Sequence, residues 1–246
     1  MRDLGRVVGH IPARGGSKRV KSKNLRYIAG RPLLSYSIEV ARLANRIDEV
    51  VVNTDSDEIA SLGEACGAKI FRRDQELASD SASGDAFTYD FLKKYEVDTL
   101  VMISPVCPLV EVSDVDGALE AFTQDQESDT LITCCSTRMQ TFKGDEPVNI
   151  SLDGPLAPSQ DNDLVHTLNW AVTIWNAKAY LENYERDGYA YIGVHRTLFP
   201  IAMTHGVKIS VESDFATAEA LLKARGITGG TDDAKYWNID SVVDWK

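Results

Sequence analysis

Cysteine, proline and long apolar runs are all scarce in this chain. Its four cysteines, Cys66, Cys107, Cys134 and Cys135, show neither the paired spacing of a zinc site nor the density of a disulfide-bonded domain, so we expect buried free thiols. No uncharged apolar run approaches the roughly 18 to 20 residues that cross a bilayer, and the chain does not open with a signal-peptide core. These absences predict a soluble, cytoplasmic protein that does not enter a membrane.

Positive charge is also in short supply. The chain has 26 Lys and Arg against 37 Asp and Glu, which gives a net charge of −11 and a pI near 4.8. This balance weighs against non-specific binding to a nucleic-acid backbone or an anionic membrane. The remaining composition is ordinary for a globular protein, with 43% hydrophobic and 26% charged residues in 246. That length suffices for one sizeable α/β domain.

Short apolar runs and helix-like stretches alternate through the first half of the chain. The expected strands are residues 6–11, 49–54, 69–71, 99–103, 130–135, 171–175 and 207–211. The expected helices are residues 32–46, 55–67, 83–96, 177–184 and 213–225, with another that begins at residue 113. Two starts carry capping boxes, Asp55 with Glu58 and Ser113 with Asp116. This α/β alternation predicts a mainly parallel sheet sandwiched by helices, with ligands at the carboxyl ends of the strands.

The alternation is interrupted between residues 138 and 168, where Pro, Gly, Asn, Asp and Gln dominate. We interpret this segment as an excursion from the sheet, either a mobile lid or an arm that packs on a partner subunit. Residues 1–226 then form a single domain. The tail of residues 227–246, which is rich in glycine and aspartate, is expected to be loosely attached.

The cations are unevenly placed along the chain. Seven of them fall between residues 14 and 31, without a single Asp or Glu among them. These are Arg14, Lys18, Arg19, Lys21, Lys23, Arg26 and Arg31. An acidic protein that gathers positive charge in one short stretch is expected to bind a polyanion there.

The basic stretch directly follows the first expected strand and contains Gly15 and Gly16. Two glycines remove side chains that would block a phosphate and expose backbone N–H groups as donors, to which Ser17 can add a hydroxyl. The spacing fits neither a Walker loop nor the G-x-G-x-x-G dinucleotide fingerprint. The cations placed to neutralise a triphosphate are Arg14, Lys18, Arg19 and Lys23. A solvated turn is the alternative, which the position behind a strand disfavours.

The stretch from Ile11 to Leu25 resembles the signature loop of the acylneuraminate cytidylyltransferases, the CMP-sialic acid synthetases and their relatives. Further similarity lies in residues 29–33, 54–60, 71–73, 76–78, Asp80, 105–109, Asn169, 214–215 and 218–219. The resemblance covers roughly residues 6 to 225 and implies a Rossmann-like fold of the nucleotide-diphospho-sugar transferase type. It also implies a homodimer with the 138–168 excursion at the subunit boundary.

The resemblance implies a nucleotidyltransferase that uses CTP and Mg²⁺. The anomeric hydroxyl of a 2-keto-3-deoxy sugar acid would attack the α-phosphate, a reaction that depends mainly on alignment and charge stabilisation. By matching position, Arg14 and Lys23 would take the catalytic role. The implied nucleotide contacts are Arg14, Gly15, Gly16, Ser17, Lys18, Arg19, Lys23, Asn24, Arg73 and Ser83. For Arg73 the alternative is a surface residue that bonds to the backbone.

The metal positions depart from the family's pattern. The magnesium aspartates expected six and four residues before Asp214 are Lys208 and Ser210 here; an ammonium cannot ligate Mg²⁺ and a hydroxyl does so weakly. Three explanations stay open. Another carboxylate, from Glu212, Asp214 or Asp55, holds the metal; or Lys208 replaces part of its charge; or the chain binds nucleotide without transfer. Asp214 is the metal candidate, although it equally fits a helix cap.

The residues expected around the sugar acceptor also differ from the family's pattern. Residues 104–108 lose an amide and two hydroxyls relative to the family's Gln-Pro-Thr-Ser-Pro, and Trp170 stands where the family has glycine. Asn169 and Trp170 are the expected substrate contacts, with a core tryptophan as the alternative reading of Trp170. We therefore expect a sialic-acid-like or related acceptor; a catalytically impaired nucleotide-binding homologue and a nucleotidyltransferase with a different acceptor are the alternatives. The four histidines have no metal-like pairing and are expected to be structural.

Overall fold

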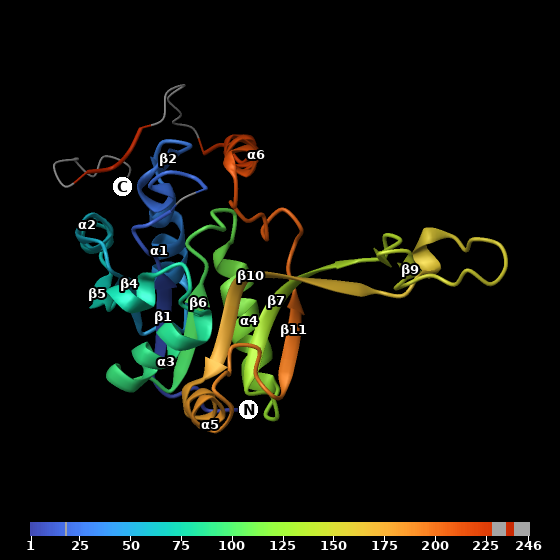
Figure 1. Cartoon of the computed structure of the whole chain (residues 1–246), viewed down its shortest axis with the longest axis horizontal. Helices are drawn as coiled ribbons and strands as arrows, with labels where there is room; N and C mark the ends of the chain where they lie inside the picture. Colours follow the sequence, from blue (N-terminus) through green and yellow to red (C-terminus); the bar gives the residue numbers. More distant parts are fainter. Residues whose placement is uncertain (18, 228–234, 239–246) are drawn as a thin grey trace.

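A computed structural model of the chain describes residues 1–17, 19–227 and 235–238 (Figure 1). Its centre is a seven-stranded sheet in the order β11-β7-β10-β6-β1-β4-β5. The strands are β1 (Val7–Pro12), β4 (Glu49–Thr54), β5 (Lys69–Arg72), β6 (Thr99–Ile103), β7 (Thr130–Thr137), β10 (Val165–Asn176) and β11 (Arg196–Pro200). Neighbouring strands are parallel except where β10 pairs with β6 and β7. The expected mainly parallel sheet is confirmed.

Helices cover both faces of the sheet. They are α1 (Leu33–Leu43), α2 (Asp57–Ala65), α3 (Gly84–Lys94), α4 (Val112–Gln124), α5 (Ala177–Asp187) and α6 (Glu212–Ala224), with 3-10 turns η1 (Lys23–Leu25), η2 (Gln75–Ala78) and η3 (Ser159–Asp161). Successive side chains of a strand point to opposite faces. Val7 and Ile11 of β1 therefore pack with α1, α2 and α4, whereas Val8 packs with α3 and α5. Because both faces are buried, the sheet is a rigid support for the loops at its ends.

One expected strand is wrong. Residues 207–211 form no strand, and β11 pairs with β7 at the edge of the sheet instead. The apolar pattern that suggested a strand comes from Ile209, which is fully buried in a cluster with Phe215 of α6. The N–H of Ile209 donates to the carbonyl of Val106 at 2.9 Å. A loop residue that is buried by tertiary packing thus imitates the alternation of a strand.

Two helix starts also differ from expectation. Ser56, not Asp55, caps α2, and its Oγ accepts a hydrogen bond from the N–H of Ile59 at 3.3 Å. The capping box of α4 is formed by Glu111 and Asp114, two residues before the expected pair, with the Glu111 N–H 2.9 Å from Asp114 Oδ2. Adjacent polar residues compete for a cap, and the sequence alone does not decide between them.

The segment that interrupts the alternation is an arm. β7 and β10 run together beyond the other strands, and a small hairpin of β8 (Phe142–Lys143) and β9 (Glu146–Pro147) lies between them. The arm projects away from the body of the molecule (Figure 1). The irregular part ends earlier than residue 168, because β10 already begins at Val165. The exposed apolar side chains of the arm are Met139, Phe142, Val148, Leu152, Leu156 and Leu164.

The tail is attached more firmly than expected where it is described. Trp237 is 3% exposed and packs in the core cluster on the α1 side of the sheet. Its N–H donates to the Leu25 carbonyl at 2.9 Å, and the N–H of Tyr27 donates to the Lys235 carbonyl at 2.8 Å, beside the β2 (Tyr27–Ile28) and β3 (Arg31–Pro32) hairpin. The expected loose attachment is wrong for residues 235–238; the rest of the tail beyond residue 227 lies outside the described residues.

The structure also bears on the expectations for the cysteines and for membrane spans. None of the four cysteines, all of which lie in the described ranges, forms a disulfide; Cys66, Cys107 and Cys134 are buried, and Cys135 is partly exposed. Over the described ranges, no helix combines the length and the apolar character that a membrane span requires.

Candidate active site

The basic loop lies at the carboxyl end of β1. β1 pairs in parallel with β4 on one side and with β6 on the other, so the chain connections diverge here. In open α/β sheets, ligands bind at such a point of divergence. A pocket of about 450 Å³ opens at this place. Its lining consists of Pro12, Arg14, Ser17, Arg19, Lys23, Asn24, Asp80, Pro105 and Val106.

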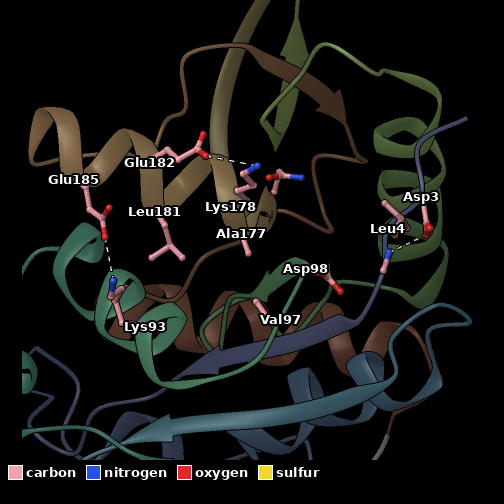
Figure 2. Close-up of a pocket in the computed structure, with 12 residues that line it drawn as sticks. Asp3, Leu4, Lys93, Val97, Asp98, Ala177, Lys178, Leu181, Glu182 and Glu185 are labelled. Atoms are coloured by element: carbon pink, nitrogen blue, oxygen red, sulfur yellow. Dashed lines mark hydrogen bonds and ion pairs between the residues drawn. The ribbon is translucent and has the colours of Figure 1, made fainter.

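A larger pocket, of about 750 Å³, lies at the opposite end of the central strands (Figure 2). It is lined by residues 3–5, just before β1, and by side chains of α3 and α5. Its lysines are paired within the wall: Lys93 lies 3.1 Å from Glu185 and Lys178 lies 3.9 Å from Glu182. This pocket is at the amino ends of β1 and β6, and its lining carries four carboxylates against two lysines. The basic pocket is therefore the better candidate site for a phosphate ligand.

Gly15 brings the loop against the start of α2. Its N–H donates to Asp55 Oδ1 at 3.0 Å, and a Cβ on this residue would lie 3.0 Å from the Ser56 Cβ. The N–H of Ser17 donates to the Gly15 carbonyl at 2.9 Å. The expectation that Gly15 exposes its amide is therefore wrong in this conformation. The Gly16 N–H makes no hydrogen bond to the described residues, and the space beside its Cα is open.

Arg14 and Asn24 form one wall of the pocket. Arg14 Nη2 pairs with Asp80 Oδ1 at 2.8 Å, and Nη1 donates to the Ala78 carbonyl at 3.2 Å. Asn24 is buried, and its Nδ2 donates to the Arg14 carbonyl at 3.3 Å. Its Oδ1 is buried without a hydrogen-bond partner among the described residues. An unpaired buried acceptor costs free energy, so a donor group on a ligand would be stabilising here.

Lys23 is half-buried at the floor of the pocket. Its Nζ donates to the Ile209 carbonyl at 2.8 Å. Burial lowers the pKa of Lys23, and the positive charges of Arg19 and Lys208 lower it further, whereas Asp214 opposes them. A cation held in a partly desolvated place attracts an anion more strongly than one in bulk water. Lys18, the remaining predicted contact of the loop, lies outside the described residues.

Arg73 is almost fully buried, which rules out the surface alternative. Its Nε and Nη2 donate to the side-chain and backbone oxygens of Asn53 at 2.9 and 3.0 Å, and its guanidinium lies 4.3 Å from the centre of the Phe87 ring. Asn53 Nδ2 contacts His10 Nε2 at 3.0 Å. Burial and the Arg73 charge lower the pKa of His10 to about 3, so its neutral imidazole accepts from Asn53. Burial lowers the pKa of Arg73 to about 10, which leaves it charged.

Ser83 and Asn169 are engaged by the protein itself. Ser83 caps α3, and its Oγ accepts from the Ala86 N–H at 3.1 Å. Asn169 is buried, and its Oδ1 accepts from Thr133 Oγ1 at 2.7 Å and from the Ala171 N–H at 3.0 Å. Neither residue lines the basic pocket. Their contacts with nucleotide and acceptor stay predictions, as does that of Arg73.

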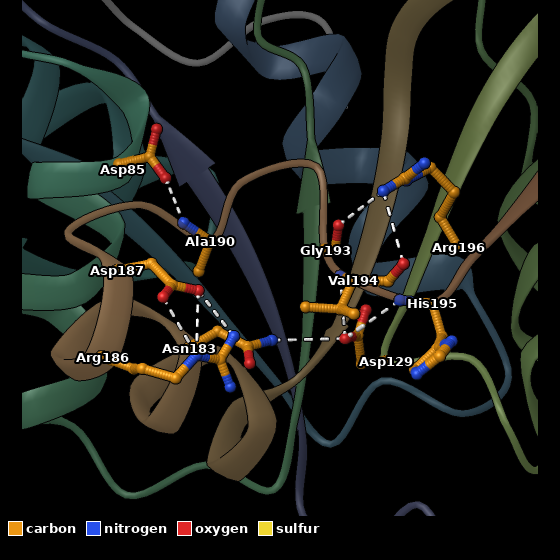
Figure 3. Close-up of polar contacts among 10 residues, drawn as sticks. All are labelled: Asp85, Asp129, Asn183, Arg186, Asp187, Ala190, Gly193, Val194, His195 and Arg196. Carbon is orange, nitrogen blue, oxygen red and sulfur yellow. Dashed lines mark hydrogen bonds and ion pairs between the residues drawn. The ribbon is translucent and has the colours of Figure 1, made fainter.

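Trp170 adopts a backbone conformation that favours glycine, with φ of +57°. Its ring lies 5.3 Å from that of Tyr191, between ring centres. Two aspartates fix the loop that carries Tyr191. Asp85 Oδ1 accepts from the Tyr191 N–H at 2.8 Å and from the Ala190 N–H at 2.6 Å. Asp129 Oδ2 accepts from the Val194 N–H at 3.0 Å; Figure 3 shows the contacts with Ala190 and Val194. The two rings form an apolar surface near the carboxyl end of β6, because Val172, two residues after Trp170, pairs with the last residue of that strand.

The candidate carboxylates for a metal each have a structural partner. Asp214 Oδ2 accepts from the N–H groups of residues 210–211 at 2.7 and 2.9 Å, which lowers its pKa and caps α6. Glu212 pairs with Arg26 at 2.6 Å, and Asp55 is bonded to the glycine loop. In the part of the chain that the structure describes, no three His, Cys, Asp or Glu side chains gather to hold a metal ion. The described donors therefore do not fit a Mg²⁺ ion held by protein side chains alone. Asp214 as one ligand of a metal that phosphate oxygens also hold stays a prediction.

Two residues near the site were missed by sequence reasoning. Asn53 orients Arg73 and His10 from inside β4, and an amide in an otherwise apolar strand is a signal that could have identified it. Tyr191 lies against Trp170 only through the fold, and nothing in its local sequence indicates this. Within the described residues, no histidine belongs to a group of three side chains that could hold a metal ion; His205, for example, contacts Asp114 at 2.8 Å.

Comparison with known proteins agrees with this geometry. A family model described as cytidylyltransferase matches residues 8–205. Post-translational flagellin modification protein B of Campylobacter coli is 30% identical over 91% of this chain and 98% of its own length. CMP-N,N'-diacetyllegionaminic acid synthase of Legionella pneumophila is 27% identical over 89% of this chain and 97% of its own length. A solved CMP:2-keto-3-deoxy-manno-octonic acid synthetase complexed with CTP superposes with a TM-score of 0.70 at 20% identity, over 90% of this chain and 100% of that one.

Proposed function

Because this chain belongs to the acylneuraminate cytidylyltransferase family of nucleotidyltransferases, we propose that it transfers CMP from CTP to a sialic-acid-like 2-keto-3-deoxy sugar acid. The anomeric hydroxyl oxygen bonds to the α-phosphorus while the bond between that phosphorus and the oxygen bridging to the β-phosphate breaks. The hydroxyl proton passes to solvent, and pyrophosphate leaves with the electron pair of the broken bond.

The observation that carries this proposal is the convergence of Arg14, Arg19 and Lys23 on one pocket at the carboxyl end of β1. Phosphoryl transfer needs alignment and charge stabilisation more than covalent help from the protein. Lys23 spends one N–H on the Ile209 carbonyl, which fixes its position and leaves two donors for phosphate oxygens. Arg14, held by Asp80, presents a planar cation suited to the departing pyrophosphate.

The acceptor class is supported by the relatives and by the pocket edge. One relative that matches along almost its whole length is named as a synthase of a CMP-linked legionaminic acid. The apolar surface of Trp170 and Tyr191 suits the acetamido and methyl groups of such acids, because burying apolar groups there costs no polar contact. We propose that the acceptor binds at this edge, next to the α-phosphate of CTP.

The direct test measures pyrophosphate release from CTP with a panel of nonulosonic acids, with N-acetylneuraminic, legionaminic and pseudaminic acid among them. Release that depends on one acid of the panel supports the proposal. Binding of CTP without release for any acid would favour the alternative, a nucleotide-binding homologue that does not transfer. Competition by UTP and GTP tests the base, and a preference for GTP would contradict the cytidine assignment.

We also propose that the protein acts as a homodimer through the arm. The arm exposes six large apolar side chains that the body of one chain does not cover, and apolar patches of this kind mark interaction surfaces. Light scattering on the full chain should give the mass of a dimer, and the Leu152→Asp, Leu156→Asp double variant should shift it to a monomer. A monomer for the unmodified chain contradicts this proposal. The cytoplasmic location stays a prediction that cell fractionation tests.

A further inference from the structure

Residues 208–211 are fixed against the basic pocket by their backbone. The Ile209 N–H donates to the carbonyl of Val106, which lines the pocket, and the Ile209 carbonyl accepts from Lys23 Nζ at 2.8 Å. Ile209 itself is fully buried. Lys208, one residue earlier, is therefore anchored beside the phosphate-facing end of Lys23, although its own side chain is exposed.

Three positive charges lie together at this place. Arg19 and Lys23 line the same pocket, and the charges of Arg19 and Lys208 lower the pKa of Lys23 in the same direction as burial does. Lys208 and Lys23 also both act on the buried thiol of Cys107, which lowers the pKa that burial raises. Arg19 and Lys208 are exposed, and neither forms a salt bridge with a carboxylate of the described residues. Asp214 is the carboxylate that raises the pKa of Lys23, and it is itself hydrogen-bonded to two backbone N–H groups.

Such an arrangement is unfavourable without an anion. Like charges held near one another repel, and the cost is recovered when a group of opposite charge binds between them. A divalent ion between carboxylates would normally supply positive charge to a triphosphate. Here the positive charge is already on the protein, and the same charge repels a free divalent cation.

We propose that Lys208, together with Lys23 and Arg19, binds the phosphate chain of CTP directly, so that this protein binds CTP without a divalent cation. This inference rests on the proposed use of CTP at the same pocket. The alternative is that CTP binds through a divalent cation held by carboxylates. The two models differ in a measurable way, because only direct binding predicts that chelation of metal leaves the affinity for CTP unchanged.

Calorimetric titration of CTP into the full chain, once with excess EDTA and once with Mg²⁺, tests the inference. We expect the two dissociation constants to agree within about threefold. Lys208→Ala should weaken binding in EDTA by roughly tenfold, because one charge-assisted contact is lost. Lys178→Ala, an exposed lysine of α5 in the opposite pocket, is the matched control and should leave both constants unchanged.

A second variant reverses the chemistry. In Lys208→Asp, Ser210→Asp, the two changed side chains are carboxylates, so CTP binding should become dependent on Mg²⁺. Mn²⁺ titration followed by electron paramagnetic resonance, without nucleotide, should show binding by this variant and none by the unmodified chain. Thermal unfolding of each variant establishes that it is folded.

The failures are distinguishable. If the unmodified chain binds CTP only with Mg²⁺, or if Lys208→Ala binds CTP as well as the unmodified chain in EDTA, the inference is wrong while the proposed function stands. If the chain binds CTP under neither condition, the proposed function fails and the inference fails with it.

Discussion

The carboxylate of Asp55 accepts a hydrogen bond from the backbone N–H of Gly15, at 3.0 Å, inside the loop that the phosphates of CTP are proposed to approach. An acid therefore lies next to an anion site. It holds the loop against the start of α2, and its charge opposes the binding of a triphosphate.

This relationship predicts that Asp55→Asn binds CTP more tightly. The amide oxygen can still accept from Gly15, while the negative charge is gone, so we expect the dissociation constant for CTP to fall by roughly threefold. Calorimetric titration measures it. Asp57→Asn is the matched control, because Asp57 is exposed and pairs with Arg72 away from the pocket. Equal effects of the two substitutions would show that net charge, not the position of Asp55, is responsible.

Arg14→Ala should lower kcat/KM for CTP by roughly 10- to 100-fold. A charge-assisted contact to phosphate contributes about 1.5 to 3 kcal/mol, and the guanidinium of Arg14 lines the pocket. Steady-state kinetics with saturating acceptor give the value. Arg72→Ala removes the same charge from the surface and should leave kcat/KM unchanged. Unaltered kinetics for Arg14→Ala would exclude this residue from the site.

Trp170→Gly should be more stable than Trp170→Ala by about 1 kcal/mol. Both remove the ring, but at φ of +57° alanine carries the steric cost of its Cβ and glycine does not. Urea unfolding of the two variants measures the difference. If alanine proves equal or better, Trp170 does not hold the strained conformation described here. Both variants should also change which acceptor acid is preferred, since each opens the surface that faces Tyr191.

The buried His10 predicts a dependence of stability on pH. Its pKa falls to about 3 in the folded chain, so between pH 3 and 6.5 the unfolded chain binds a proton that the folded chain excludes. The contribution of neutral His10 is fully present above pH 6.5 and is lost as the pH falls towards 3. At about pH 5 the free energy of unfolding should be lower by roughly 2 kcal/mol than at about pH 7.5. His10→Gln, which cannot titrate, should lose this part of the pH dependence; identical pH profiles would contradict the assignment.

The central sheet could be predicted from the sequence because its strands carry their own signal. Residues 7–12, 49–54 and 99–103 are mainly apolar and are buried on both faces, as expected of strands between two layers of helices. The basic loop was predictable for a similar reason, since glycines and cations are local features. Family resemblance then supplied the reaction, which composition alone did not.

The errors fall where distant parts of the chain decide the outcome. Ile209 was predicted to lie in a strand because it is apolar, but it is buried by packing against α6. Asp55 was predicted to cap a helix, but its carboxylate accepts a hydrogen bond from Gly15 in the basic loop. The antiparallel direction of β10 depends on its pairing with β6 and β7, which no short window of sequence contains. Trp237 was assigned to a loose tail, yet it is buried in the core, and its N–H bonds to the Leu25 carbonyl in the first third of the chain.

Strand β10 connects the arm to the part of the sheet that lies beside the basic loop. β10 pairs with β7 out to Val165, is irregular between Leu168 and Thr173, and only then pairs with β6 beside β1. We therefore expect the arm, residues 138–168, to tolerate changes in length or composition without a change in the register of the strands that carry the basic loop. The arm and the part of the sheet that carries the basic loop are thus separable. A chimera that carries the arm of a relative should keep its turnover of CTP but pair with a different subunit.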